Sequence, residues 1–237
     1  MVNTEDQSFF PEGVESTLFP VNRARYQVLT RLLESLPITK GKVLEIGSFL
    51  GQSALLWSEV LARHCAFGGS VLCVDPWRPF LSGEDIHAGP LYRQTQASME
   101  DGAAFEQFKR NISAAPLGAP ITFFRGTLEE LVKTRHPTPF DLVYIDGSHY
   151  YQDVKKDLLL AQPLVRVGGI LCGDDLEMQL PEVDEEVCRR ECDRQRDFID
   201  YHPGVTLAVW EEFGAVWVEH GAWAMRRVSG RDWKAPF

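Results

Sequence analysis

The sequence has no long apolar run and no excess of basic residues. None of its hydrophobic stretches approaches the roughly 20 residues of a membrane-spanning helix, and residues 1–11 lack the basic and apolar regions of a signal peptide. With 24 Lys and Arg against 34 Asp and Glu, the net charge is -10, which disfavours binding to the phosphate backbone of nucleic acid. These absences predict a cytoplasmic protein that binds neither membrane nor nucleic acid.

Cysteine is also scarce and shows no regular spacing. The chain has 5 cysteines, and their irregular positions do not make the framework of a disulfide-stabilised domain. Cys73 and Cys172 lie inside apolar runs, where a thiol behaves as a small buried hydrophobic group. The sequence therefore predicts reduced core cysteines, in agreement with a cytoplasmic location.

Short apolar runs alternate with stretches of helical spacing along most of the chain. Repeated strand–helix–strand units predict a mostly parallel sheet with helices on both faces. We expect one Rossmann-like, doubly wound α/β domain that ends in an antiparallel strand pair. The expected strands are residues 42–46, 71–74, 121–124, 140–145 and the run from 170, followed by the pair 215–219 and 222–228.

Two segments fall outside this regular pattern. Residues 1–40 are expected to form an N-terminal helical or lid segment ahead of the domain at 41–237. Residues 76–102 form a long connection, and connections of this length inside a compact domain are usually functional. Its side chains, which include Trp77, His87 and Tyr92, make it a candidate substrate lid.

The first expected strand leads into the turn Gly47-Ser48-Phe49-Leu50-Gly51. A dinucleotide site usually requires G-x-G-x-x-G so that the pyrophosphate can approach the backbone, but Phe49 takes the place of the middle glycine. Glu45, just before the turn, suits an ammonium group and opposes a phosphate. Asp75 ends the second strand, where a carboxylate can bind two ribose hydroxyls. The turn therefore predicts a nucleoside ligand that carries an ammonium group.

Three carboxylates follow two later strands. Asp146 ends the strand at 140–145, and Asp174 and Asp175 follow the strand that begins at 170. If these strands are neighbours about 4.8 Å apart, the carboxylates meet, and a hard divalent ion such as Mg²⁺ would neutralise them. His149 could then take a proton from a hydroxyl held at the metal. The simpler alternative is that Asp174 or Asp175 caps a helix and His149 bonds within its own loop.

Four stretches resemble a known family: VLEIGSFLGQS (43–53), VLCVDPW (71–77), FDLVYIDGSHYYQDVKKDL (140–158) and GGILCGDDL (168–176). They look like class I S-adenosylmethionine-dependent methyltransferases. The last two stretches resemble the Mg²⁺-dependent macrolide-sugar O-methyltransferases and their cephalosporin-hydroxylase-like relatives.

The resemblance implies a set of site residues. His149 and Asp146 would be catalytic, and Asp146, Asp174 and Asp175 would bind the metal. Thr127, after the third strand, would lie near the adenine. The full set expected around the cofactor is Glu45, Gly47, Ser48, Phe49, Gly51, Ser53, Asp75, Trp77, Thr127 and Asp146.

We therefore predict an S-adenosylmethionine-dependent O-methyltransferase, assisted by a divalent metal, that methylates a hydroxyl of a sugar, a polyketide or another natural product. The resemblance and the N-terminal aromatic residues Phe9, Phe10 and Phe19 also favour a homo-oligomer. Two alternatives remain open at this point. One is a nicotinamide-dependent oxidoreductase, and the other is a non-catalytic nucleoside-binding protein of the same fold.

Overall fold

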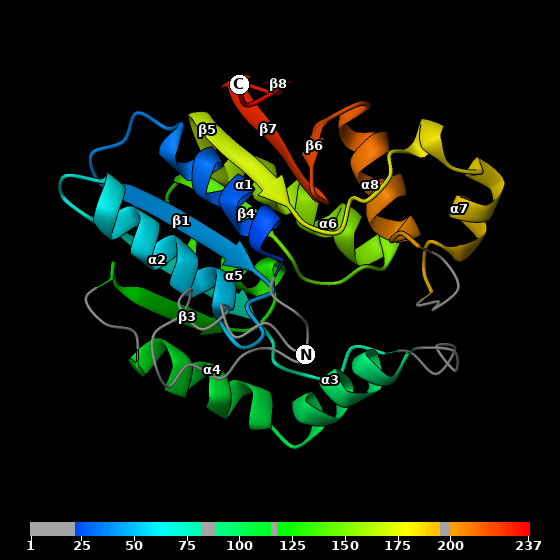
Figure 1. Cartoon of the computed structure of the whole chain (residues 1–237), viewed down its shortest axis with the longest axis horizontal. Coiled ribbons are helices and arrows are strands. Elements are labelled where there is room, and N and C mark those ends of the chain that lie inside the picture. The colour runs from blue at the N-terminus through cyan, green and yellow to red at the C-terminus, as the bar shows by residue number, and fades with distance from the viewer. Residues whose placement is uncertain (1–21, 82–88, 115–117, 195–199) are drawn as a thin grey trace, which may run out of the picture.

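A computed structural model of the protein describes residues 22–81, 89–114, 118–194 and 200–237 (Figure 1). The expected features at Phe9, Phe10, Phe19 and His87 lie outside these residues. No helix in the described ranges is long and apolar enough to cross a membrane.

An eight-stranded sheet forms the centre of the molecule, in the order β3-β2-β1-β4-β5-β7-β6, with β8 paired to β7. The first five strands are parallel, and β7 runs antiparallel to β5, β6 and β8. This confirms the predicted Rossmann-like sheet with its antiparallel C-terminal part. The strands are β1 (Gly41–Ile46), β2 (Gly69–Asp75), β3 (Ile121–Arg125), β4 (Phe140–Ile145), β5 (Val165–Gly173), β6 (Trp217–Glu219), β7 (Ala222–Ser229) and β8 (Asp232–Lys234).

Helices cover both faces of this sheet, because successive strand residues point to opposite sides. Val43 belongs to a core shared with α1 (Arg23–Glu34), α2 (Gln52–His64) and α4 (Ala103–Ala114). Its neighbour Leu44 belongs to a second core, on the other face, shared with α5 (Leu128–Arg135), α6 (Tyr151–Ala161) and α8 (Pro203–Phe213). Strand order reverses between β1 and β4, so the C-terminal ends of these strands border the crevice where doubly wound folds bind ligands.

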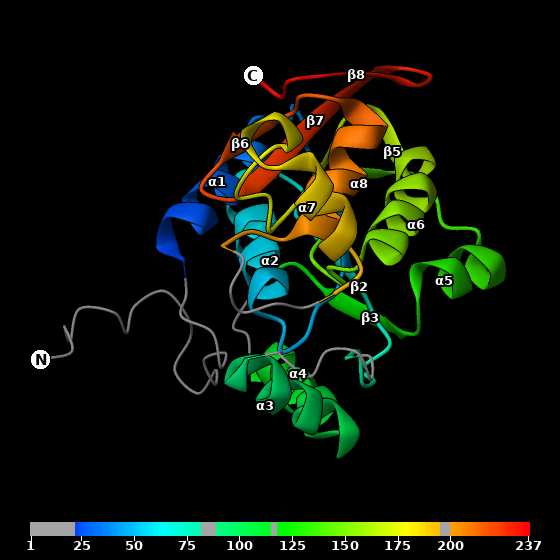
Figure 2. The ribbon, with the colours of Figure 1, turned by 90° about the vertical axis from the view of Figure 1, so that its right-hand side faces the viewer.

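Several elements differ from the sequence-based expectation. Within the candidate lid, α3 (Pro90–Glu100) forms a helix that begins with proline, a residue preorganised for the first helical turn. It lies beside α4 at the side of the molecule away from the C-terminal strands (Figures 1 and 2).

The later part of the chain also departs from expectation. The charged stretch at 181–198 was expected to form one helix, but its described part contains the end of a 3-10 turn and the short helix α7 (Glu185–Glu191), and α8 follows it. Strand β5 starts before the predicted Ile170, because a bulge opposite Asp141 absorbs the glycines at 168 and 169. The terminal strand β8 was not predicted. Two 3-10 turns, η1 (Gln162–Leu164) and η2 (Leu180–Glu182), complete the described elements.

The junction of β1 and β4 leaves no space for a side chain at Gly47. Gly47 has a φ of +84°, and a β-carbon there would lie 2.0 Å from the carbonyl oxygen of Asp146. We expect Gly47→Ala to lower the free energy of unfolding by about 2 kcal/mol more than Gly102→Ala. Gly102 is the matched control, since it has a similar φ of +76° but no neighbouring atom within 4 Å of its β-carbon position. Urea unfolding measures both changes, and equal losses would contradict the steric explanation.

Candidate active site

The loop at residues 47–51, the cofactor loop, is fastened to the end of β2 by Asp75. The Asp75 carboxylate accepts backbone N–H bonds from Ser48 (3.0 Å), Phe49 (2.9 Å) and Trp77 (2.6 Å). Burial raises the pKa of Asp75, and the three N–H donors oppose that rise. Asp75, the residue predicted to bind the ribose, therefore also holds the loop in shape.

Glu45 is buried below this loop at the end of β1. Its carboxyl accepts hydrogen bonds from the hydroxyl of Ser53 and the thiol of Cys73. Burial raises the pKa of Glu45 to about 8, and the charge of Asp146 adds to the rise. At neutral pH this carboxyl is therefore largely protonated, and a cationic ligand beside it would favour its ionised form.

Gln52, at the start of α2, supplies an unsatisfied donor beside these residues. Its side-chain nitrogen is buried and has no acceptor among the residues that the structure describes. A buried donor without a partner is costly, and a polar ligand at the cofactor loop would remove that cost. Gln52 was not among the predicted cofactor residues.

Two predicted cofactor residues have clear structural roles here. The side chain of Trp77 is buried, packs against Phe105 and Phe108, and donates its indole N–H to the carbonyl oxygen of Phe49 at 2.8 Å. Thr127 is the N-cap of α5 and forms a reciprocal capping box with Glu130. Trp77 thus holds the cofactor loop through the Phe49 carbonyl, and Thr127 begins the helix that follows β3.

Asp146, Asp174 and Asp175 lie at one edge of the sheet, and we call them the acidic cluster, although among the described residues only His149, Asp175 and His202 have ligand atoms that all lie within 4.8 Å of one another. Strand β4 pairs with β5 so that Ile145 lies beside Gly173, which brings the residues after both strands to one edge. The hydroxyl of Tyr144 lies 3.1 Å from Asp146 Oδ2 and 3.3 Å from Asp174 Oδ2. Burial and the charge of Asp175 raise the pKa of Asp146 to about 6, and they raise the pKa of Asp174 well above its usual value.

Arg25, from the first turn of α1, reaches into the acidic cluster. Its Nη1 donates to Asp174 Oδ2 and lies 3.9 Å from Asp175 Oδ1. Its Nε donates to the carbonyl oxygen of His220 at 3.3 Å. Arg25 was not among the predicted site residues, because nothing in the sequence of a surface helix distinguishes an arginine that points to a site from one that points to solvent.

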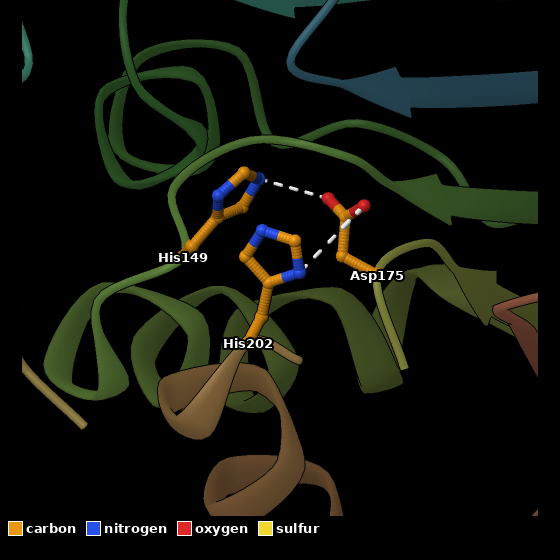
Figure 3. A group of neighbouring side chains, drawn as sticks. All are labelled: His149, Asp175 and His202. Atoms are coloured by element: carbon orange, nitrogen blue, oxygen red, sulfur yellow. Dashed lines mark ion pairs between the residues drawn. The ribbon is translucent and has the colours of Figure 1, made fainter. Parts of the chain in front are cut away.

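Asp175 also faces two neighbouring histidines, His149 and His202, whose ring centroids lie 4.3 Å apart (Figure 3). His149 Nε2 lies 2.8 Å from Asp175 Oδ2, and His202 Nδ1 lies 4.0 Å from Asp175 Oδ1. Although burial alone raises the pKa of Asp175, the neighbouring His149 and His202 hold it well below the usual value. The aspartate is therefore ionised and orients the His149 ring.

His202 has further partners from two other segments. Its Nδ1 lies 3.2 Å from both carboxylate oxygens of Glu177, and its Nε2 lies 3.0 Å from the hydroxyl of Tyr92 on α3. Burial lowers the pKa of His202, but Asp175 and Glu177 outweigh that effect and raise it. His202 was not among the predicted site residues; it is the N-cap of α8 and is brought to the site only by folding.

Two donor sets for a divalent ion share Asp175. The first is the acidic cluster, whose oxygen donors suit Mg²⁺. The second is His149, Asp175 and His202, whose ligand atoms all lie within 4.8 Å of one another and whose imidazoles suit transition metals. The acidic cluster fits a dication electrostatically, because one guanidinium does not balance three buried carboxylates. Two of these carboxyls keep raised pKa values even with Arg25 in contact.

Comparison with known proteins assigns the fold and the family. The family model described as a methyltransferase domain matches residues 44–176, more than half of the chain. The O-methyltransferase ankF of Aspergillus thermomutatus is 31% identical over 136 residues, which is 56% of this chain and 45% of that protein. The chain therefore matches less than half of that relative's length.

Among solved structures, the O-methyltransferase NovP superposes with a TM-score of 0.61 at 19% identity, covering 87% of this chain and 80% of NovP. The calicheamicin methyltransferase CalS11 superposes with a TM-score of 0.50 at 15% identity, covering 85% of this chain and 77% of CalS11. At these identities the two structures show the shared fold. The family model, which describes a methyltransferase domain, disfavours the nicotinamide-dependent oxidoreductase alternative. The chain belongs to the methyltransferase domain family.

Proposed function

We propose that this chain methylates a hydroxyl group of a small molecule, a sugar, a polyketide or another natural product. The observation that carries the proposal is the pair formed by His149 Nε2 and Asp175 Oδ2, 2.8 Å apart. The backbone N–H of Asp146, three residues before His149, donates to the carbonyl oxygen of Ile46 at the end of β1 (2.8 Å), which ties the segment that carries His149 to the start of the cofactor loop. The names of ankF, an O-methyltransferase, and CalS11, a calicheamicin methyltransferase, support this acceptor class.

The residues at the end of β1 and β2 fit the cofactor. Glu45 would take the ammonium group of the methionine moiety, Asp75 the ribose hydroxyls, and the Gln52 amide a further polar group. Gly47, Ser48, Phe49, Gly51 and Ser53 would form the cradle, with Trp77 supporting it and Thr127 near the adenine. When bound, S-adenosylmethionine supplies a methyl group on a positively charged sulfur.

The role of His149 in this proposal is to accept the proton of the acceptor hydroxyl. Asp175 holds Nε2, so the ring is oriented and its other nitrogen, Nδ1, can act as the base. The ionised Asp175 stabilises the imidazolium that forms when the ring accepts the proton. A non-catalytic nucleoside-binding protein would have no need of such an oriented pair.

A divalent ion would be held by Asp146, Asp174 and Asp175. When bound, it supplies a Lewis acid that lowers the pKa of an acceptor hydroxyl. Tyr144 keeps Asp146 and Asp174 turned toward each other. Tyr92 places α3 against His202, which supports the proposal that α3, within the candidate lid, covers the acceptor.

The test of the function separates cofactor binding from turnover. Calorimetry with S-adenosylhomocysteine should give an affinity in the micromolar range, about -8 kcal/mol. An assay that follows the transfer of a radiolabelled methyl group from S-adenosylmethionine to a panel of sugar and polyketide alcohols should then identify acceptors. Tight cofactor binding with no transfer to any member of a broad panel would favour the binding protein.

Cofactor affinity should depend on pH through Glu45. In the free protein its pKa is about 8, so at lower pH a proton must leave before the carboxylate can pair with the ligand ammonium. S-adenosylhomocysteine affinity should therefore rise by up to about tenfold per pH unit as the pH approaches 8. Glu45→Gln should flatten this rise, while Glu129→Gln on the surface of α5 should retain it. Parallel curves for the Glu45 variant and the wild type would exclude the role of Glu45.

Turnover should depend on His149 more than cofactor binding does. We expect His149→Gln to lower kcat by about 10²–10⁴-fold, the usual contribution of a general base, and to leave S-adenosylhomocysteine affinity unchanged. Asp175→Asn should also lower kcat, since the His149 ring then loses its ionised partner. The control is His64→Gln at the exposed end of α2. An unaltered kcat in the His149 variant would assign the proton to another group.

A further inference from the structure

The gap between Asp174 and Asp175 already contains a cation. Arg25 Nη1 bonds to Asp174 Oδ2 and lies 3.9 Å from Asp175 Oδ1. An ion bound by both oxygens would lie about 2.0–2.6 Å from each of them, and therefore in the space that Nη1 fills. The guanidinium is charged at every working pH, so it would repel a dication at that distance.

Arg25 is also held from its other side. Its Nε bonds to the carbonyl of His220, and a β-carbon at Gly221 would lie 3.1 Å from its Nη2. The turn between β6 and β7 thus fits closely around the guanidinium. The side chain is nevertheless 22% exposed, whereas that of Asp174 is 5% exposed. Arg25 therefore has a route to solvent that the carboxylate lacks.

We propose that Arg25 is the resident counter-cation of the Asp174–Asp175 pair, and that a divalent ion binds this pair only by displacing it. Because Arg25 belongs to the first turn of α1, metal binding is then coupled to the docking of that helix. The inference rests on the metal site of the proposed function and extends it to regulation by the N-terminal helix.

The charges around the pair explain why the exchange is possible in both directions. Arg25 faces the carboxylates Asp146, Asp174 and Asp175 together with the Tyr144 hydroxyl. His149 lies against Asp175 Oδ2, and His202 approaches Asp175 Oδ1, the oxygen that Arg25 also approaches. One guanidinium leaves the carboxylates under-neutralised, which favours a dication. The bonds of Arg25 to Asp174 and His220 favour the metal-free arrangement.

The test is the affinity of the full chain for Mn²⁺, which accepts oxygen and nitrogen ligands. Electron paramagnetic resonance of free Mn²⁺ gives the dissociation constant for the wild type, Arg25→Gln, Arg25→Lys and Arg31→Gln. We expect Arg25→Gln to bind Mn²⁺ about tenfold or more tightly than the wild type, since it removes a competing charge. Arg31→Gln is the matched control, because Arg31 lies on the same helix but pairs with the distant, exposed Glu219. Arg25→Lys, which keeps the charge, should stay closer to the wild type.

Equal or weaker Mn²⁺ binding by Arg25→Gln would overturn the proposal, as would the absence of binding by both proteins. If Arg25→Gln does not fold, hydrogen exchange of the wild type decides. Saturating Mn²⁺ should then speed exchange in the first turn of α1, and unchanged exchange would overturn the proposal.

These readouts are separate from those of the proposed function. S-adenosylhomocysteine binding should be the same in the wild type, Arg25→Gln and Arg31→Gln. Competition between Arg25 and Mn²⁺ without methyl transfer to hydroxyl acceptors would reject the proposed reaction and keep the ion exchange. Methyl transfer without competition between Arg25 and Mn²⁺ would support the proposed reaction and reject the ion exchange.

Discussion

The site depends on the cost of bringing three carboxylates together at one buried edge of the sheet. Parallel pairing of β4 and β5 makes this unavoidable, because it aligns Ile145 with Gly173 and so places Asp146 beside Asp174 and Asp175. Like charges at this distance must be neutralised or protonated. The structure uses cationic and proton-donating groups from four segments: Arg25 of α1, Tyr144 of β4, His149 after β4 and His202 before α8. Elements far apart in the sequence thus contact the same acidic cluster.

The cofactor half of the site follows a different principle, the fixing of a loop by backbone hydrogen bonds. Asp75 accepts three N–H groups and so sets the shape of the cofactor loop before any ligand arrives. Trp77 also fixes the loop, because its indole N–H donates to the carbonyl oxygen of Phe49. A preorganised loop loses little conformational entropy when a ligand binds. The acidic residues Glu45 and Asp75 therefore serve the fold and the proposed binding together.

Much of this organisation could be predicted from the sequence. The alternation of apolar runs and helical spacing predicted the doubly wound sheet, and Asp146, Asp174 and Asp175 were expected to meet if their strands were neighbours. The errors fell where local pattern is ambiguous. The helix α3 lies in a segment rich in Gly, Pro and Ser, and β5 extends through a glycine-containing bulge that looks like a turn in sequence.

The sequence by itself determined the five parallel strands, the cofactor loop and the acidic residues at the ends of β2, β4 and β5. Side-chain periodicity and strand-end position are local properties, so they can be read along the chain. Only the tertiary structure decided which cationic and proton-donating groups lie against the acidic cluster. Arg25 and His202 lie on separate helices, and their approach to Asp174 and Asp175 depends on how α1 and α8 pack on opposite faces of the sheet. Packing of that kind is set by contacts between distant residues, and no local pattern encodes it.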